Sequence, residues 1–80
     1  MIAIEYRNED KGQEMEADLI YIASTKKIAL KWMKDNINYN PEDDLWWWAI
    51  YTVEADKELE WNDLEFYNPQ GNKLEDQPVR

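Results

Sequence analysis

The longest stretch without a charged residue runs from Leu45 to Val53, and its pattern predicts a strand. In an extended chain, alternate residues point to opposite faces. One face would carry Leu45, Trp47, Ala49, Tyr51 and Val53, and the other would carry Trp46, Trp48, Ile50 and Thr52. The alternative is a helix that begins at Asn40-Pro41, but a helix that is apolar on every side does not suit so small a protein. Trp, Ile, Tyr, Thr and Val also favour strands, so we predict an extended segment with two apolar faces.

Two further strands are expected before this stretch. Met1 to Tyr6 alternates large apolar side chains with Ala or Glu, which is typical of a half-buried strand. Ala17 to Ala23 is apolar on both faces of an extended chain and predicts a more central strand. The spacing of Met15, Leu19 and Ile22 also suits a helix, and this alternative stays open at the level of sequence.

One amphipathic helix is expected from about Thr25 to Ile37. Ser24 or Thr25 can cap its start, because a side-chain hydroxyl accepts a hydrogen bond from the first-turn backbone. Apolar residues recur at helical spacing along one side, namely Ile28, Ala29, Trp32, Met33 and Ile37. The other side carries Lys27, Lys31 and Lys34. We interpret these lysines as a solvent-exposed face, with a docking surface for an acidic partner as the alternative.

Shorter strands are expected in the last part of the chain. Glu58 to Trp61 alternates acidic and apolar residues. In the segment from Leu64 to Tyr67, Leu64 and Phe66 alternate with Glu65 and Tyr67. Asn68-Pro69-Gln70-Gly71 has the residues of a type I turn, with Pro at its second position and Gly at its fourth. A short last strand is expected at Lys73 to Glu75, followed by a disordered tail at Asp76 to Arg80.

These segments together predict a single α+β domain over residues 1–80. Four to five mainly antiparallel strands would form one sheet, and the helix at about Thr25 to Ile37 would pack on one of its faces. A chain of this length buries only about 60 to 65% of the surface that its unfolded form exposes. It has no Cys to form disulfides, so the five Trp, five Tyr and one Phe are expected to supply most of the core.

The composition argues against an enzyme and against a metal or cofactor site. The chain has neither His nor Cys, which are common proton-transfer groups and transition-metal ligands. Glu42, Asp43 and Asp44 form the densest group of carboxylates, but their spacing matches no Ca²⁺ loop. We interpret them as part of an exposed loop, and we expect no bound metal and no cofactor.

The net charge of −9, from 18 acidic and 9 basic residues, opposes direct binding to nucleic acids and to anionic membranes. No apolar run approaches the roughly 18 residues that a helix needs to cross a bilayer. Glu5 and Arg7 interrupt the N-terminal segment where a signal peptide would need an apolar core. We therefore expect a cytoplasmic protein.

The segment from Phe66 to Glu75 resembles the terminal hairpin of glyoxalase and bleomycin-resistance proteins. In that family a similar turn precedes a strand that bears a metal-ligand Glu, and Glu75 matches that position. The resemblance covers this hairpin closely, while the His ligands that the family often uses are absent here. We interpret the likeness as shared turn chemistry.

A function in protein binding is expected from the two apolar faces of the Leu45 to Val53 stretch. A single helix covers one face only, so the other face would be left to a partner protein or to a second copy of the chain. We assign Trp46, Trp48 and Ile50 to this open face as a candidate interface, because Trp is a frequent interface anchor. Burial of Trp46 and Trp48 in the core is the alternative. The alternative is an acidic inhibitor that imitates nucleic acid through one ridge of carboxylates, Glu54, Asp56, Glu58 and Glu60.

Overall fold

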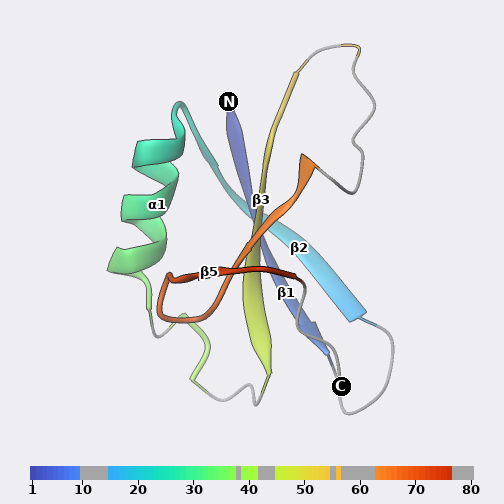
Figure 1. The fold of residues 1–80 in the computed structure, drawn as a ribbon, viewed down its shortest axis with the longest axis vertical. Helices are drawn as coiled ribbons and strands as arrows, with labels where there is room; N and C mark the ends of the chain where they lie inside the picture. Colours follow the sequence, from blue (N-terminus) through green and yellow to red (C-terminus); the bar gives the residue numbers. More distant parts are fainter. Residues whose placement is uncertain (10–14, 38, 42–44, 55, 57–62, 77–80) are drawn as a thin grey trace.

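The structure is a computed structural model that describes residues 1–9, 15–37, 39–41, 45–54, 56 and 63–76. These residues form a five-stranded antiparallel sheet with one helix packed against it, which confirms the predicted α+β class (Figure 1). The predictions for Glu42 to Asp44, for a strand at Glu58 to Trp61 and for a tail at residues 77–80 lie outside the described residues.

The strands lie in the order β2-β1-β3-β4-β5, and each neighbouring pair is antiparallel. The two long inner strands are β1 (Ile2–Glu9) and β3 (Trp46–Thr52). β2 (Met15–Ala23) forms one edge, and β4 (Glu65–Tyr67) and β5 (Lys73–Leu74) complete the other side. The predictions of a first strand, a strand in the tryptophan stretch and a short last strand are confirmed.

The position of β2 corrects the sequence analysis in two ways. Ala17 to Ala23 is extended, so the helical alternative for this segment is wrong. The strand also lies at the edge of the sheet rather than near its centre. Its apolar side chains are not all buried, because Leu19 is 57% exposed and Ile22 is 42% exposed.

A β-bulge in β2 decides which of its side chains share a face. Ile4 of β1 pairs with Tyr21, whereas the next residue, Glu5, pairs with Leu19, so Ile20 is an extra residue in the ladder. Directly paired residues of an antiparallel ladder project to the same face. Leu19 and Ile22 therefore project to the same face of the sheet, although their spacing of three would separate them in a regular strand.

Helix α1 (Lys26–Asp35) begins and ends close to the predicted limits. Thr25 is its N-cap, and its Oγ1 accepts a hydrogen bond of 3.2 Å from the backbone N–H of Ile28. Asn36 ends the helix, and its side-chain amide donates to the carbonyl of Trp32 at 2.8 Å. Ala29 and Met33, one turn apart, are fully buried against the sheet.

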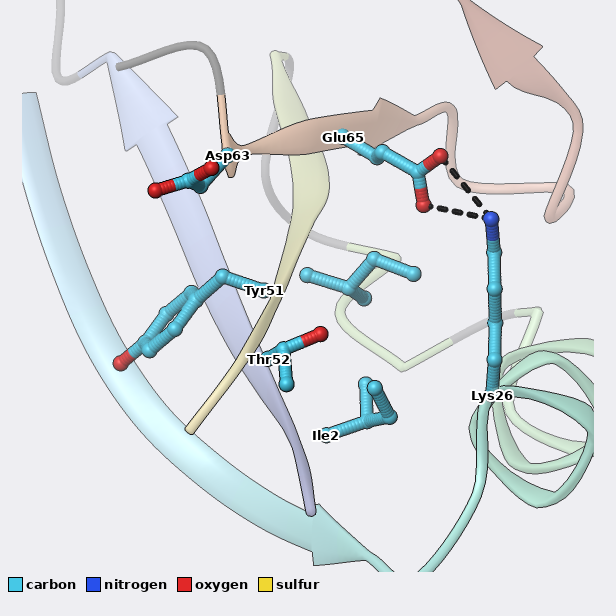
Figure 2. A pocket seen from close by; sticks show the side chains of 7 residues that line it. Ile2, Lys26, Tyr51, Thr52, Asp63 and Glu65 are labelled. Carbon is cyan, nitrogen blue, oxygen red and sulfur yellow. Dashed lines mark hydrogen bonds and ion pairs between the residues drawn. The ribbon is translucent and has the colours of Figure 1, made fainter. Parts of the chain in front are cut away.

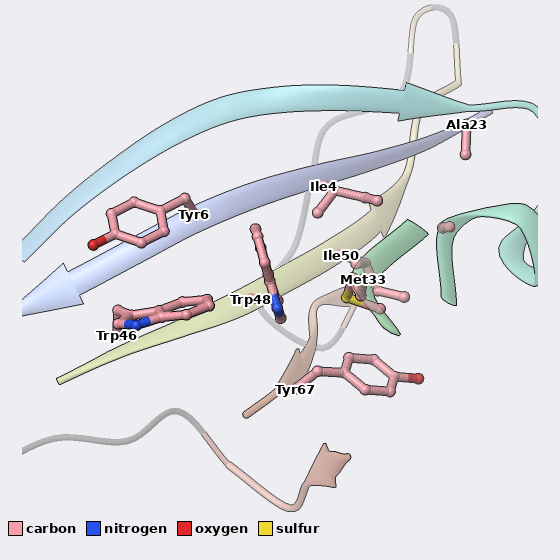
Figure 3. Close-up of a cluster of buried hydrophobic side chains, with 9 residues drawn as sticks. Ile4, Tyr6, Ala23, Met33, Trp46, Trp48, Ile50 and Tyr67 are labelled. Carbon is pink, nitrogen blue, oxygen red and sulfur yellow. The ribbon is translucent and has the colours of Figure 1, made fainter. Parts of the chain in front are cut away.

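The face of the sheet that α1 covers, here the helix face, carries the larger part of the core. Figure 3 shows Trp46, Trp48 and Ile50 on the side of β3 where Met33 of the helix lies. These three β3 side chains are at most 5% exposed. The expectation that they occupy the face left open by the helix is therefore wrong. Leu45, Trp47, Ala49 and Tyr51 lie on the opposite face, here the second face, because side chains alternate along β3.

The turn at Asn68-Pro69-Gln70-Gly71 forms as predicted. The N–H of Gly71 donates to the carbonyl of Asn68 at 2.8 Å, and the Asn68 side chain accepts from the N–H groups of Gln70 and Asn72. Gly71 has a φ of +85° and is buried against Lys34 of the helix. The turn therefore joins β4 to β5 and also packs against the last turn of α1.

Candidate functional site

The second face is organised by the pairing of β1 with its two neighbours. Ala3 lies between Ile22 of β2 and Tyr51 of β3, and Glu5 lies between Leu19 and Ala49. Arg7 lies between Ala17 and Trp47 in the next row. Phe66 continues the row of Ala49, and Leu74 continues that of Phe66. Every strand of the sheet thus contributes to this face.

The middle of the second face is a small core of its own. Trp47 and Ala49 are 0% exposed and Phe66 is 5% exposed. The side chains of Leu45, Leu64 and Leu74 are partly buried and pack against this cluster. Trp47 is therefore a core residue, as its pattern in the sequence indicates. Its indole Nε1 is buried and has no hydrogen-bond partner among the residues that the structure describes.

A polar network crosses the second face beside this cluster. Arg7 Nε and Nη2 lie 3.0 and 2.9 Å from Glu5 Oε1, and the two side chains are only 17% and 14% exposed. The Arg7 guanidinium lies over the Phe66 ring, with Cζ 5.9 Å from the ring centroid. Burial, followed by the hydrogen bond that its hydroxyl donates to Glu5, raises the pKa of Tyr51 above its ordinary value of 10.0. The network holds Glu5, Arg7 and Tyr51 in fixed positions.

The β2 side of the second face is the exposed part. Ala17, Leu19 and Ile22 project from β2 next to the network, and all three are exposed. We call this group the β2 strip. The β2 strip does not follow from the sequence pattern, because the extra residue Ile20 that places Leu19 beside Ile22 is visible only in the pairing with β1.

The aromatic residues expected to bind a partner lie inside the molecule. Trp46 and Trp48 are 5% and 0% exposed, with ring centroids 4.9 Å apart and planes at 88°. The Tyr6 and Tyr39 rings lie 5.4 and 6.3 Å from that of Trp46. Trp46, Trp48 and Ile50 thus form a core with the helix, and they are not available to a partner in this fold.

The acidic residues expected to form a ridge do not extend a strand. β3 ends at Thr52, and both Glu54 and Asp56 are exposed. Asp56 has a φ of 58°, in the left-handed region, so the chain turns there instead of continuing straight. Glu58 and Glu60 lie outside the described residues. The expected alignment of four carboxylates on one strand face is therefore wrong for Glu54 and Asp56.

A shallow hollow of about 270 Å³ lies between the start of the helix, the end of β3 and β4 (Figure 2). Lys26 Nζ contacts both carboxylate oxygens of Glu65, at 2.8 and 2.9 Å, and Lys73 Nζ lies 3.3 Å from Oε1. Burial alone would raise the pKa of Glu65. The hydrogen bonds and charges of the two lysines together lower it by more than burial raises it, so the pKa lies below its ordinary value of 4.5. The hydrogen bond to Glu65 raises the pKa of Lys26 above 10.5. Both groups stay charged near neutral pH, which does not suit general acid–base catalysis.

Within the described ranges, no three acidic side chains lie close enough to hold a metal ion. Glu75, which matches a ligand position of the glyoxalase hairpin, is exposed just after β5. The resemblance is therefore carried by the turn at residues 68–71. Among the same residues no helix has the length and apolarity to cross a membrane.

No protein-family model, curated protein or solved structure gives a significant match to this chain. Any function must therefore be inferred from the geometry alone. The feature of the described surface that most resembles a binding site is the β2 strip.

Proposed function

We propose that this chain is a small, non-enzymatic protein-binding domain that contacts its partner through the β2 strip. The observation that carries the proposal is the exposure of Leu19 and Ile22, at 57% and 42%, side by side on one face of an edge strand. Adjacent exposed apolar side chains commonly mark a site of protein–protein contact. The side chains of Trp46, Trp48 and Ile50 support this site as core and do not belong to it.

The surroundings of the β2 strip support a preformed binding surface. The row next to it consists of Ala3, Glu5 and Arg7 of β1, and the two charged groups are held by each other and by Tyr51 and Phe66. A surface whose neighbouring side chains are already ordered loses little conformational entropy when a partner binds. Binding at the β2 strip is therefore expected to cost little ordering of the neighbouring side chains.

The chemistry of the chain favours binding over catalysis. Glu65 forms ion pairs with both Lys26 and Lys73, and its pKa is lowered. A catalytic acid or base is instead expected to have a pKa near the working pH. Neither His nor Cys is present to supply another proton donor or nucleophile. We also propose a cytoplasmic location, on the composition described above.

Site-specific photo-crosslinking in the source cells tests the proposal. A photoreactive phenylalanine analogue would replace Leu19 in one variant and Val53 in a control variant, since Val53 is exposed to a similar extent, at 44%, but is not on β2. We expect one reproducible crosslinked protein from position 19 and none from position 53. The same products from both positions, or none from position 19, would contradict the proposal.

A further inference from the structure

The backbone of β2, in addition to its side chains, is open to a partner. β2 has nine residues and is paired with β1 on one side, and no strand of the described part of the chain lies on its other side. The other edge strand, β5, has only two residues. A long edge strand presents a row of N–H and C=O groups that another extended chain can pair with. The most suitable place for such pairing is the regular segment before the bulge, Met15 to Leu19.

The side chains of this segment define the chemistry of the incoming strand. Glu16 and Asp18 alternate with Ala17 and Leu19, and no basic residue occurs between Met15 and Ala23. Opposite charges that face each other across two strands stabilise their pairing, and apolar pairs do the same. A strand that alternates basic and apolar residues would place its basic residues beside the acidic positions and its apolar residues beside Leu19.

A second copy of the chain fits this edge less well. This segment has two acidic residues and no basic one, so antiparallel pairing of two β2 strands would set like charges on neighbouring chains. Like charges opposite each other destabilise a strand pair. Each copy also carries a net charge of −9, which adds a general repulsion between copies and an attraction for a basic partner.

The helix provides further apolar contact beside this edge. Trp32 stacks on Tyr21 of β2, with ring centroids 4.9 Å apart. Ile28 lies one turn before Trp32 on the same side of α1 and is 44% exposed. The helix therefore adds apolar side chains to the helix face at β2, while Leu19 lies on the second face.

We infer that β2 binds an extended segment of a partner protein, in which basic and apolar residues alternate, as a sixth strand of the sheet. This inference rests on the proposed function, and it specifies the mode of binding and the kind of partner sequence. The proposed binding mode is strand addition, in which main-chain hydrogen bonds give affinity and alternate side chains give specificity.

A designed peptide tests the inference with the purified chain. The probe is a fluorescein-labelled peptide as long as β2 in which Lys alternates with Val, and its binding is measured by anisotropy near 0.15 M salt, where long-range attraction is screened within about 8 Å. A second peptide of the same sequence carries N-methyl groups on all of its backbone amides. It keeps every charge and loses the N–H groups that a strand pair needs.

Two variants of the chain with the same net charge are compared, one as the test and the other as its matched control. Leu19→Lys changes the centre of the edge, and Val53→Lys makes the same replacement at an exposed position away from β2. We expect Leu19→Lys to weaken binding of the Lys/Val peptide by about tenfold or more, because one apolar contact is lost and a like charge is introduced. Val53→Lys should leave binding within about twofold of the original chain, since a surface change outside the contact has little effect. Amide hydrogen exchange in Met15 to Leu19 should slow when the peptide is bound.

Four results would overturn the inference. Equal binding of the N-methylated peptide would mean that charge alone attracts the probe. Equal weakening by both variants, or no binding of the Lys/Val peptide, would exclude β2 as the site. A dimer in sedimentation that Leu19→Lys abolishes would assign the edge to a second copy. If Leu19 still forms one crosslinked product in cells, these results would reject strand addition by a basic partner and leave the proposed protein-binding function intact.

Discussion

Trp32 of α1 stacks on Tyr21 of β2, with ring centroids 4.9 Å apart and ring planes at 15°. This pair joins the helix to the edge strand that carries the β2 strip. On the helix face, β2 is thereby packed against α1 through Tyr21. On the second face, Leu19 of the same strand stays exposed. The stability of the helix packing and the shape of the candidate site therefore depend on the same strand.

A double-mutant cycle on Trp32→Leu and Tyr21→Leu should give a coupling free energy of about 0.5 to 1.5 kcal/mol, as measured for other aromatic pairs. The measurement is the free energy of unfolding in urea for the four proteins of the cycle. A second cycle on Tyr21→Leu and Phe66→Leu is the control, because Phe66 lies on the second face. Its coupling should stay within about 0.5 kcal/mol of zero, as for separated sites. Equal coupling in the two cycles would contradict a specific Trp32–Tyr21 contact.

Replacing Glu65 with Gln should lower stability at pH 7 by less than about 1 kcal/mol, because its ion pairs are partly exposed and screened by solvent. Since the folded-state pKa of Glu65 is below its ordinary value of 4.5, the ionised carboxylate stabilises the fold above that pH. This contribution is lost as the pH falls through the folded-state pKa. The difference between the two proteins should therefore disappear in acid.

Urea unfolding at pH 7 and near pH 3 measures this dependence. Glu75→Gln is the matched control, because it removes the same charge from an exposed position after β5. It should show little difference from the original chain at either pH. A Glu65→Gln effect that persists unchanged in acid would indicate a packing role for Glu65 instead of its ion pairs with Lys26 and Lys73.

Replacing Tyr51 with Phe removes the hydroxyl that donates to Glu5 and should cost about 0.5 to 1.5 kcal/mol at pH 7, the usual value of one hydrogen bond. The folded-state pKa of Tyr51 is raised above 10.0, mainly by burial, so the protonated phenol stabilises the fold below that pH. As the pH rises through the folded-state pKa, this contribution is lost. The variant and the original chain should therefore converge in strong alkali.

The measurement is urea unfolding at pH 7 and at a pH above 10. Tyr39→Phe serves as a control for removal of a tyrosine hydroxyl, since Tyr39 is 44% exposed. Convergence of Tyr51→Phe with the original chain in alkali, without a comparable change for Tyr39→Phe, is the expected result. A Tyr51→Phe protein as stable as the original chain at pH 7 would argue against the network on the second face.

Replacing Gly71 with Ala should destabilise the protein by about 1 to 3 kcal/mol, the usual cost of a left-handed conformation for a residue with a side chain. Gly71 has a φ of +85°, and an added Cβ would lie 3.2 Å from Lys34 Cγ. The flexible Lys34 side chain can move, so the backbone conformation is expected to cause most of the loss. Gln70→Ala, in the same turn and exposed, should change the free energy of unfolding by less than about 0.5 kcal/mol. Equal stability of the Gly71→Ala protein would contradict this account.

Local patterns in the sequence were sufficient to predict the elements but not their environment. Thr25 caps the helix as predicted, and Gly71 ends the turn as predicted, because both depend on neighbouring residues only. The two faces of β3 are both apolar, so alternation could not indicate which face the helix covers. That choice depends on contacts of Trp46 and Trp48 with residues distant in the chain.

The candidate site could not be predicted from the sequence for a related reason. Whether β2 is an edge or a central strand depends on the strand order, which short-range periodicity does not contain. The bulge at Ile20 then changes which residues of β2 share a face. Leu19 and Ile22 were correctly read as apolar residues of a strand, but their exposure follows only from these two long-range features.

The inner place of β1 in the sheet also sets an order of assembly during synthesis. Ile2 pairs with Thr52, so β1 waits for the synthesis of β3 before it gains its inner neighbour. Until then, β1 can pair only with β2, and the helix has no Trp46, Trp48 or Ile50 to pack against. Long-range pairing of this kind slows folding and prolongs the exposure of apolar surface. The nascent chain is therefore most vulnerable to aggregation before β3 has emerged, and completion of the tryptophan stretch is the step that ends this period.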